Sequence, residues 1–413
     1  MPVLETLREK GCRLKTIALL DPFWTGHHSS YLKLFSKTLL SLDHNVMVLC
    51  SNPSEINSWA EAICDKNQGR LHVFEIHEPK GSSCPVLRIQ MALDSLLWWR
   101  FAARAIKKAQ SETGCRPDLV FFPWMDSCLG RFQNHHIIDR IFPYNWSGLY
   151  FHPLHLRMKL PWSAANGGLH DYDESLRSDR CRSVAILDEG VADILQQKLP
   201  DKPVVIFPDV ADATQPDLNS PIVQEVIAKA RGRKIISLIG GLAKRKGMLT
   251  LLETAQRPEA KDWFFMFAGH LSEESFDAND LLMIRYIASD PPQNCYFHFD
   301  FIPHEAQFNA LVKASDILFG CYENFPHSSN LLAKAAIFEK HVIVSKGFCM
   351  EERVRTFGMG ECIEYGDVLQ GIKAIGRLIE TELQADFAGY RNLHSEERLR
   401  MVLQDVCTQY SGN

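Results

Sequence analysis

A glycine-rich basic turn is the first feature of the sequence whose residue types could do chemistry. The segment IGGLAKRKG occupies residues 239–247 and includes Gly240, Gly241 and Lys246. Backbone N–H groups in such a turn can surround phosphate oxygens, and a lysine can neutralise their charge. The GxxxxGK[ST] spacing of a P-loop is absent. Taken alone, the turn fits a solvated basic loop better than a ligand site, so its interpretation depends on what lies near it.

A second polar cluster occupies residues 323–334, with the sequence ENFPHSSNLLAK. Ser328 or Ser329 is placed to cap a helix and Asn330 follows, so the N–H groups and hydroxyls of this helix start suit an anion. The carboxylate of Glu323, at the end of a strand, can accept hydrogen bonds from hydroxyl groups. A plain N-cap beside a surface acid explains these residues equally well. The two clusters together, both at strand ends of the same half, favour a ligand that carries a diphosphate.

The first half of the chain offers two further loops. The segment GHHSS at residues 26–30 follows the first strand and opens a helix, where N–H groups suit an anion. Ser29 or Ser30 can instead be an ordinary N-cap, with two histidines facing solvent. His152 stands at the carboxyl end of a strand expected over 148–152. A lone histidine is more often structural than catalytic, and its strand-end position favours a function only modestly.

The elements that must hold these residues alternate between strands and helices. Strands are expected over 15–20, 45–50, 71–76, 118–122, 148–152, 183–187 and 204–207, and after a restart over 234–239, 263–268, 295–299, 317–319 and 341–345. Helices are expected near 247–256, 366–381 and 385–410. Such alternation predicts parallel sheets, whose ligands bind outside the carboxyl ends of the strands. The predicted fold class is therefore α/β, with two Rossmann-like doubly wound domains and a cleft between them.

The length of the chain also indicates two domains, because 413 residues exceed what a single core usually holds. The polar, proline-containing stretch 210–221 is typical of a linker. We therefore expect one domain over 1–208 and a second over 209–384. A C-terminal helix over 385–413 is expected to pack back on the first domain.

Composition and charge argue against several classes of protein. A formal net charge of −5, without a concentrated basic face, argues against nucleic acid as a partner. The twelve cysteines form no CxxC pair and no cluster with zinc-site spacing, so neither a metal site nor a disulfide framework is expected. Free thiols, a charged N-terminus without an apolar segment and the lack of any bilayer-length apolar run predict a cytoplasmic location.

An aromatic and basic stripe, LLWWRF at residues 96–101 followed by Arg104, Lys107 and Lys108, has near-helical spacing. Such a stripe can lie on a membrane surface, which would give the protein a peripheral position on the inner face of a membrane. More often, a stripe of this kind is core with a solvated edge. The segment PWSAANGGLH at residues 161–170 is either a flexible cover for an acceptor or an ordinary connection.

Five passages, in this order, resemble the family 4 glycosyltransferases, which are retaining enzymes of GT-B fold. They are SVAILDEGVADIL with VVIFPDVAD, ISLIGGLAKRKGMLTLLETA, FMFAGH, FHFDFIPHEAQFNALVKASDILF and YENFPHSSNLLAKAAIFEKHVIVS. The resemblance covers most of the chain, is loose over 55–180 and is strongest from residue 183. It implies that the first domain holds the acceptor and that the second domain binds a nucleotide sugar.

The resemblance also implies a role for each matching residue. Lys246 stands where the family's lysine binds the donor diphosphate, and Glu323 stands where the first acid of the E-x7-E motif holds the donor sugar. His152 matches a histidine near the sugar and completes the implied catalytic set. Further donor contacts are implied at Gly26, His27, Gly240, Gly241, Pro303, Ser328, Ser329, Asn330 and Lys334.

Two positions depart from the family pattern. Gly241 occupies the place of an arginine that binds the diphosphate. The second glutamate of E-x7-E, which holds the ribose, corresponds to Leu331 by counting from Glu323 and to Lys334 by anchoring on the next strand. The absence of that acid leaves open either a reshaped nucleotide site or a loss of activity.

The resemblance therefore implies a retaining hexosyltransferase that moves a sugar from a nucleotide-diphosphate sugar to an unknown acceptor, which could be a glycan, a lipid or a small molecule. No cofactor is expected, and no DxD-type pair of acids at a strand end calls for a metal. Two alternatives stay open. One is a catalytically degenerate homologue that binds a nucleotide or a partner, and the other is a nucleotide-sugar epimerase or sugar phosphorylase of the same fold.

Overall fold

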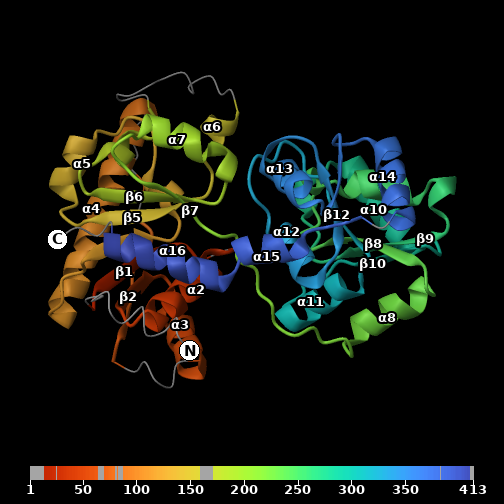
Figure 1. Ribbon diagram of the computed structural model, residues 1–413, viewed down its shortest axis with the longest axis horizontal. Coiled ribbons are helices and arrows are strands. Elements are labelled where there is room, and N and C mark those ends of the chain that lie inside the picture. Colours follow the sequence, from red (N-terminus) through yellow and green to blue (C-terminus); the bar gives the residue numbers. More distant parts are fainter. Residues whose placement is uncertain are drawn as a thin grey trace. The chain divides into compact units, whose positions relative to one another are not determined.

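The computed structural model describes residues 14–24, 26–63, 69–79, 81, 87–158, 171–381 and 383–409. The expected acceptor cover, residues 161–170, lies outside these ranges. The chain divides into two compact units, Met1–Pro208 with Glu396–Asn413, and Asp209–Ser395. Each unit is built on one parallel sheet, and the labels in Figure 1 identify its strands and helices.

The sheet of the first unit has seven parallel strands in the order β3-β2-β1-β4-β5-β6-β7. These strands are β1 (Thr16–Asp21), β2 (Asn45–Cys50), β3 (Leu71–Glu75), β4 (Leu119–Phe122), β5 (Trp146–Tyr150), β6 (Cys181–Ile186) and β7 (Val204–Ile206). The central strands β1 and β4 are buried along their whole length, as apolar runs covered on both faces must be. The strand order reverses between β1 and β4, and ligands of doubly wound sheets bind at such a switch point.

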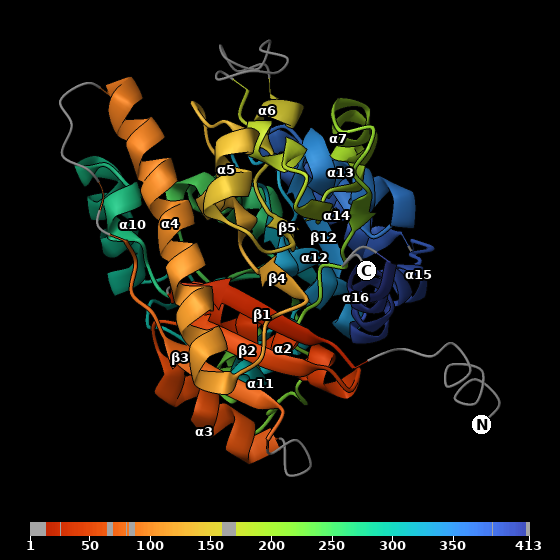
Figure 2. The ribbon, with the colours of Figure 1, turned by 90° about the vertical axis from the view of Figure 1, so that its left-hand side faces the viewer.

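Helices cover both faces of this first sheet. They are α2 (His28–Ser41), α3 (Pro53–Ile63), α4 (Leu87–Thr113), α5 (His135–Ile141), α6 (Leu154–Arg157), α7 (Ala192–Lys198) and α16 (Glu396–Gln409). Phe121 of β4 meets Phe35 of α2, whereas the neighbouring Phe122 meets Trp99 of α4, the long helix seen in Figure 2. Successive strand residues point to opposite sides, so α2 and α4 lie on opposite faces. The last helix, α16, packs on α2.

The sheet of the second unit has six parallel strands in the order β10-β9-β8-β11-β12-β13. These strands are β8 (Lys234–Ile239), β9 (Trp263–Ala268), β10 (Cys295–His298), β11 (Ile317–Gly320), β12 (His341–Ser345) and β13 (Gly360–Ile363). The reversal of strand order falls between β8 and β11. The loops that follow these two strands contain the two clusters predicted to bind a diphosphate.

Eight α-helices of the described chain belong to the second unit. They are α8 (Pro221–Ala230), α9 (Met248–Ala255), α10 (Ala278–Ser289), α11 (Glu305–Ala314), α12 (Asn330–Phe338), α13 (Phe348–Phe357), α14 (Val368–Glu380) and α15 (Phe387–Leu393). Alternate residues of β8 pack into two separate apolar cores. Ile235 and Ile239 belong to one core, and Ile236 and Leu238 belong to the other. Both faces of this sheet are therefore covered.

The predicted α/β fold class, with two Rossmann-like doubly wound halves, is confirmed by these two sheets. One strand was not predicted: β13 has the short sequence GECI, in which only Ile363 is buried, so no apolar run marks it. Strand β5 ends at Tyr150, which places His152 two residues beyond the strand rather than at its last position. The helix predicted over 385–410 is wrong as a single element, because α15 and α16 are separated by residues 394–395.

The cysteines agree with the expectation of buried thiols. No disulfide joins the cysteines that lie in the described ranges, and most of these side chains are buried. Burial raises the pKa of the Cys50 thiol to about 11 and that of the Cys181 thiol to about 12. These thiols therefore stay protonated near neutral pH and act as small apolar side chains.

Candidate functional site

The glycine-rich turn after β8 lies against the end of β11, at the switch point of the second sheet. Gly240 has a φ of 102°, a backbone conformation that favours glycine. Gly247 has a φ of 80°, and a Cβ atom at this position would lie 2.6 Å from the carbonyl oxygen of Cys321. The turn therefore needs glycine at both ends, and at Gly247 the close approach to Cys321 adds a second reason.

The two predicted clusters meet through the main chain. The N–H of Glu323 donates to the carbonyl oxygen of Arg245 at 2.7 Å, which joins the loop after β11 to the basic turn. Tyr365, which follows β13, donates its hydroxyl hydrogen to the carbonyl oxygen of Lys244 at 3.2 Å. Burial raises the pKa of Tyr365, and the negative charge of Glu323 adds to this shift. Glu323 therefore lies near a protonated phenol at the carboxyl edge of the sheet.

The three cations of the basic turn have different partners. Lys244 forms ion pairs with Asp280 at 2.5 Å and with Asp277 at 3.0 Å. Hydrogen bonds to these two carboxylates raise the pKa of Lys244. The guanidinium of Arg245 lies 5.7 Å from the ring centroid of Phe325.

Lys246 has no carboxylate partner within the part of the chain that the structure describes. Its Nζ lies 5.7 Å from the ring centroid of Tyr322, and a Cβ atom added to Gly241 would come within 3.5 Å of it. The ammonium group is thus held near the glycines by the face of an aromatic ring. Arg245 also has no carboxylate partner among the described residues, but of these two cations Lys246 is the one whose charge lies beside Gly241 in the glycine turn.

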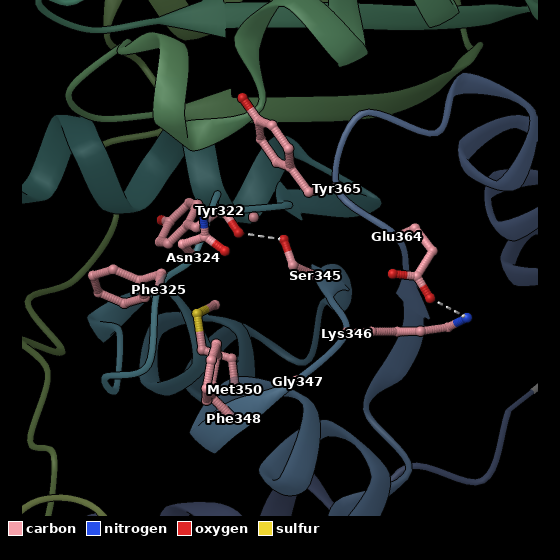
Figure 3. Close-up of a pocket in the computed structure, with 11 residues that line it drawn as sticks. Tyr322, Asn324, Phe325, Ser345, Lys346, Gly347, Phe348, Met350, Glu364 and Tyr365 are labelled. Atoms are coloured by element: carbon pink, nitrogen blue, oxygen red, sulfur yellow. Dashed lines mark hydrogen bonds and ion pairs between the residues drawn. The ribbon is translucent and has the colours of Figure 1, made fainter. Parts of the chain in front are cut away.

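A pocket of about 140 Å³ adjoins these loops, at the carboxyl ends of β11, β12 and β13 (Figure 3). It is lined by Gly320, Tyr322, Asn324, Phe325, Ser345, Lys346, Gly347, Phe348, Met350, Glu364 and Tyr365. The hydroxyl of Ser345 donates to the carbonyl oxygen of Tyr322 at 2.6 Å, and Lys346 forms an ion pair with Glu364 at 2.9 Å. Aromatic and hydrogen-bonding walls side by side suit a small polar molecule.

The start of α12 distinguishes the two predicted serines. Ser329 is the N-cap, because its Oγ accepts the N–H of Leu331 at 3.3 Å. Ser328 instead bonds to Asp209 and to Arg353, so its hydroxyl is directed away from the helix axis and into the second unit. The side-chain oxygen of Asn330 is buried and has no hydrogen-bond partner among the described residues. The first turn of α12 therefore contains one acceptor, Asn330 Oδ1, that no described residue donates to, beside the N–H groups of the helix start.

Lys334 is buried, and its ammonium group is used inside the protein. Its Nζ donates to Asn309 Oδ1 at 2.5 Å, to the carbonyl oxygen of Asp212 at 2.7 Å and to Glu305 Oε2 at 2.9 Å. Three acceptors match the three hydrogens of an ammonium group. Pro303 lies two residues before Glu305, in the exposed loop between β10 and α11.

A buried charge cluster surrounds Ser328. The guanidinium of Arg353 donates to Ser328 Oγ at 2.5 Å, to the hydroxyl of Tyr390 at 3.3 Å and to Asp209 Oδ2 at 3.5 Å. The main-chain N–H of Asp209 donates to Nδ1 of His394 at 3.0 Å. Burial, with a smaller effect from the charge of Arg353, lowers the pKa of His394 to about 3. The cluster thus ties both ends of the second unit to the loop before α12.

The low pKa of His394 predicts a pH-dependent stability. The unfolded histidine has a pKa near 6.5, so between pH 6.5 and 3 the unfolded chain binds a proton that the folded chain does not. Stability is therefore lost as the pH falls through this window, by up to about 1.4 kcal/mol for each pH unit.

His394→Asn keeps an acceptor at the position of Nδ1 but does not titrate. Between pH 7 and pH 5, we expect urea unfolding of the variant to lose about 2 kcal/mol less stability than the native chain. An equal loss in both proteins would show that His394 is not held neutral by its surroundings.

The switch point of the first sheet carries an Asp–His pair that the sequence did not reveal. Asp21, the last residue of β1, is buried, and its Oδ2 lies 2.7 Å from Nδ1 of His28 at the start of α2. The imidazole of His28 stacks on Trp124, which follows β4, with ring centroids 4.3 Å apart. The two residues flanking the switch point are thus joined to one another through His28.

His152 lies beside the same edge with a different arrangement. Both oxygens of Asp126 accept main-chain N–H groups, from His152 and from Phe151, at 2.8 Å each. Nδ1 of His152 lies 3.6 Å from Asp126 Oδ1, beyond the range of a good hydrogen bond. Burial lowers the pKa of His152 and raises that of Asp126. His152 is therefore a neutral, partly exposed imidazole at pH 7.

The loop before α2 is exposed at Gly26 and His27. Gly26 has a φ of 69°, and no atom lies within 4 Å of the place that a Cβ would occupy. The alternative in which Ser29 or Ser30 caps the helix does not hold: α2 begins at His28, and His27 occupies the N-cap position without a side-chain bond. The first N–H groups of α2 are therefore not capped by a side chain.

The sequence matches no protein-family model and no curated protein. Solved structures match it along nearly the whole chain. A glycosyltransferase from Rickettsia africae is 13% identical with a TM-score of 0.65, and the match covers 97% of this chain and 100% of that one. Anabaena HepE in complex with UDP and glucose is 13% identical with a TM-score of 0.63, over 96% of this chain and 100% of that one. The UDP-forming α,α-trehalose-phosphate synthase from Burkholderia vietnamiensis is 10% identical with a TM-score of 0.64, over 96% and 99%.

The chain has the GT-B fold. In this GT-B chain the basic turn and the loop before α12 come together at the carboxyl edge of the second sheet, as their order in the sequence predicted. Lys334, a residue of α12, bonds instead to Glu305 of α11, and Pro303 lies in the loop before α11. Gly26, His27 and His152 belong to the first unit.

Three residues of these edges were missed by sequence reasoning. Asp21 ends the first apolar run and precedes His28 by seven residues. Both residues can be found in the sequence, but their spacing alone does not show that their side chains pair. Asp126 is a single acid after the β4 run. Tyr365 could not be placed because β13, the strand that carries it to the edge, gives no apolar signal.

The aromatic and basic stripe lies on helix α4, which has one buried and one exposed face. Trp98 and Trp99 are buried in the core of the first unit, whereas Arg104, Lys107 and Lys108 are exposed. A row of exposed apolar residues precedes them on the same helix: Leu87, Ile89, Leu93 and Leu97. Across the described ranges, no helix combines the length and apolar character that a membrane span requires.

Proposed function

We propose that this GT-B chain is a glycosyltransferase whose second unit binds a nucleotide-diphosphate sugar. The observation that carries the proposal is the position of Lys246, a cation that no described carboxylate neutralises. It lies in a glycine turn bonded directly to the loop of Glu323. A diphosphate is the ligand class that such a turn recognises, because main-chain N–H groups and one ammonium group match its oxygens.

The donor is oriented by groups around the turn. Charge builds on the diphosphate as the bond to the sugar breaks, and Lys246 together with the N–H groups at the start of α12 stabilises that charge. Glu323 accepts hydrogen bonds from the sugar hydroxyls, and the adjoining pocket takes the sugar. The resemblance to family 4 enzymes implies that the anomeric configuration is retained, and NMR of the product tests this point.

The two departures from the family pattern are compatible with the proposed diphosphate site. Gly241 has no side chain, and a Cβ added at this position would come within 3.5 Å of Lys246 Nζ, so the ammonium group lies close to the place of the missing arginine. Lys334 brings no positive charge to the nucleotide, because its buried ammonium group is paired with Glu305. Neither departure therefore repels a nucleotide diphosphate.

The acceptor is proposed to bind the first unit, and α4 favours a lipid surface near it. The side chains of Ile89, Leu93 and Leu97 are 51%, 41% and 39% exposed, at helical spacing. The exposed cations Arg100 and Arg104 continue the same face. Apolar residues followed by cations suit the surface of an anionic membrane, which makes a lipid acceptor or peripheral contact part of the proposal.

A panel of nucleotide sugars tests the proposed function. We expect UDP-glucose, GDP-mannose or ADP-glucose to raise the melting temperature, because a ligand that binds only the folded chain adds stability. The same donor should then lose its sugar to one member of an acceptor panel of glycans, small alcohols and anionic vesicles.

The alternative functions would give different results in this panel. Binding without turnover would favour a degenerate homologue, release of free nucleotide with an isomerised sugar would favour an epimerase, and turnover only with inorganic phosphate would favour a phosphorylase. A chain that binds none of the donors contradicts the proposal.

A further inference from the structure

A buried hydrogen-bond cluster joins the start of α12 to the two places where the chain passes between its units. The chain passes after Pro208 and again after Ser395, so Asp209 begins the second unit and His394 stands one residue before its end. We call the segments 205–212 and 390–397 the crossovers. Ser328, the residue before the N-cap of α12, bonds to Asp209. Every side chain of the cluster belongs to the second unit.

We propose that Ser328 is a positioning residue of the proposed donor site, and that it holds the start of α12 to both crossovers. Nucleotide binding at α12 then stabilises the crossovers, and the crossovers in turn set the affinity for the nucleotide. This inference rests on the proposed function. It adds to that function a link, within one unit, between the donor and the chain segments that leave the unit.

The contacts of the cluster run from one crossover to the other. The main-chain N–H of Asp209 donates to Nδ1 of His394 at 3.0 Å. The hydroxyl of Ser328 donates to Oδ2 of Asp209 and accepts a hydrogen bond of 2.5 Å from the guanidinium of Arg353. Arg353 also donates to the hydroxyl of Tyr390 at 3.3 Å, and the ring of Tyr390 stacks on His394 with ring centroids 4.2 Å apart. Ser328 is therefore bonded to the first crossover directly and to the second through Arg353.

Burial makes the cluster respond as a unit. Asp209 and Arg353 are each 4% exposed, and Tyr390 is fully buried. A displaced member leaves its buried partners without hydrogen bonds, and such groups cost free energy because water cannot reach them. Movement of Ser328 therefore has a cost at Asp209 and Arg353, and this cost links the loop before α12 to the crossovers.

The loop between β11 and α12 is held at both of its ends. At one end, the N–H of Glu323 donates to the carbonyl oxygen of Arg245 in the basic turn at 2.7 Å. At the other end, Ser328 is held by the cluster, and the adjacent Ser329 caps α12 by accepting the N–H of Leu331 at 3.3 Å. A diphosphate bound by the basic turn and the first N–H groups of α12 fixes this loop, and with it the position of Ser328.

Thermodynamic linkage makes the coupling reciprocal. A nucleotide that binds more tightly when the cluster is formed must lower the population of chains in which the cluster is open. The same factor describes how much more weakly the nucleotide binds when the cluster cannot form, and such factors are typically about 5–150. The N–H of Asp209 reports the open state, because its hydrogen exchanges with solvent when the bond to His394 is broken.

Hydrogen exchange of the full chain, with and without UDP, GDP or ADP, tests the link. We expect the nucleotide that binds to slow exchange in both crossovers of the native chain by about fivefold or more. Ser328→Ala keeps the cap from Ser329 and the contact of 3.5 Å between Asp209 and Arg353, so the variant should fold. It should bind the nucleotide about 5–150-fold more weakly, and at saturation the nucleotide should no longer slow exchange in the crossovers. Ser328→Thr keeps the hydroxyl and should behave as the native chain.

Ser315→Ala is the control for the loss of a hydrogen-bonded serine hydroxyl. Ser315 is buried, donates to the carbonyl oxygen of Leu311 at 2.8 Å and lies 2.6 Å from Oγ of Ser237. It precedes β11, at the edge of the sheet opposite the proposed donor site. This variant should lower the melting temperature about as much as Ser328→Ala, because each removes one hydrogen-bonded hydroxyl. Its affinity for the nucleotide and the slowed exchange in its crossovers should stay native.

Three results would overturn the inference and leave the proposed function standing. One is crossover exchange that the bound nucleotide does not change in the native chain. Another is exchange that the nucleotide slows equally in the native chain and in Ser328→Ala. The third is a Ser315→Ala variant that loses the slowed exchange, because any lost hydroxyl would then have the same effect. A native chain that binds none of the three nucleotides would overturn both the inference and the proposed function.

Discussion

Replacing Lys246 with alanine is expected to lower kcat for sugar transfer by roughly 10²–10³-fold, the usual effect of removing one preorganised group that stabilises developing charge. The ammonium group has no carboxylate partner in the described chain, it lies beside Gly241, and the face of Tyr322 lies 5.7 Å from it. Its interaction strengthens as charge builds on the leaving diphosphate, so kcat should fall more than affinity for the donor.

The same turn provides a matched control. Lys244→Ala removes an identical charge two residues away, but the Nζ of Lys244 is already paired with Asp280 and Asp277. Its loss should leave kcat within about twofold, because exposed pairs of this kind contribute little. Steady-state kinetics of both variants with the donor found in the panel is the measurement. Equal losses in the two variants would mean that only the net charge of the turn matters, and an unchanged Lys246→Ala variant would exclude the proposed diphosphate site.

The sequence predicted the fold because its signals are local. Apolar runs such as KIISLI and WFFMFA mark buried parallel strands, and the glycines after β8 mark a turn that must pass close to β11. Since the carboxyl ends of parallel strands share one edge, two loops that are far apart in the sequence could be expected to meet there. The main-chain hydrogen bond from Glu323 to Arg245 joins the two loops at this edge.

Long-range partners are what the sequence could not supply. Lys334 looks like a ligand-facing cation by its place in the motif, but its partners include Asp212, 122 residues away in the chain. Ser328 and Ser329 are equivalent as candidate caps in the sequence. In the structure, Ser328 bonds to Asp209, 119 residues away in the chain, and only Ser329 caps the helix. Asp21 and His28 are near in sequence, but only the structure shows that Nδ1 of His28 faces Asp21 and that the ring stacks on Trp124, which follows β4. Each of these outcomes depends on a contact that no periodicity encodes.

The partner of Ser328 gives the largest effect expected on stability. Arg353→Leu leaves the carboxylate of Asp209 buried without its cation, and breaking such a buried pair typically costs about 3–5 kcal/mol. For a unit of this size, the melting temperature should fall by roughly 6–20 °C. The control on the same helix is Arg355→Leu, whose guanidinium is 63% exposed and pairs with Glu351. It should not shift the melting temperature measurably.

The double variant Arg353→Leu with Asp209→Asn separates charge from packing. If the orphaned carboxylate causes the loss, neutralising it should restore most of the stability, and the two substitutions will be far from additive. Additive losses would mean that Arg353 acts through its packing against Tyr390 rather than through its charge. Arg353 also donates to Ser328 beside the capped start of α12, and this bond is lost in both the single and the double variant. Donor binding that depends on this bond should therefore stay weakened in the double variant even where stability recovers.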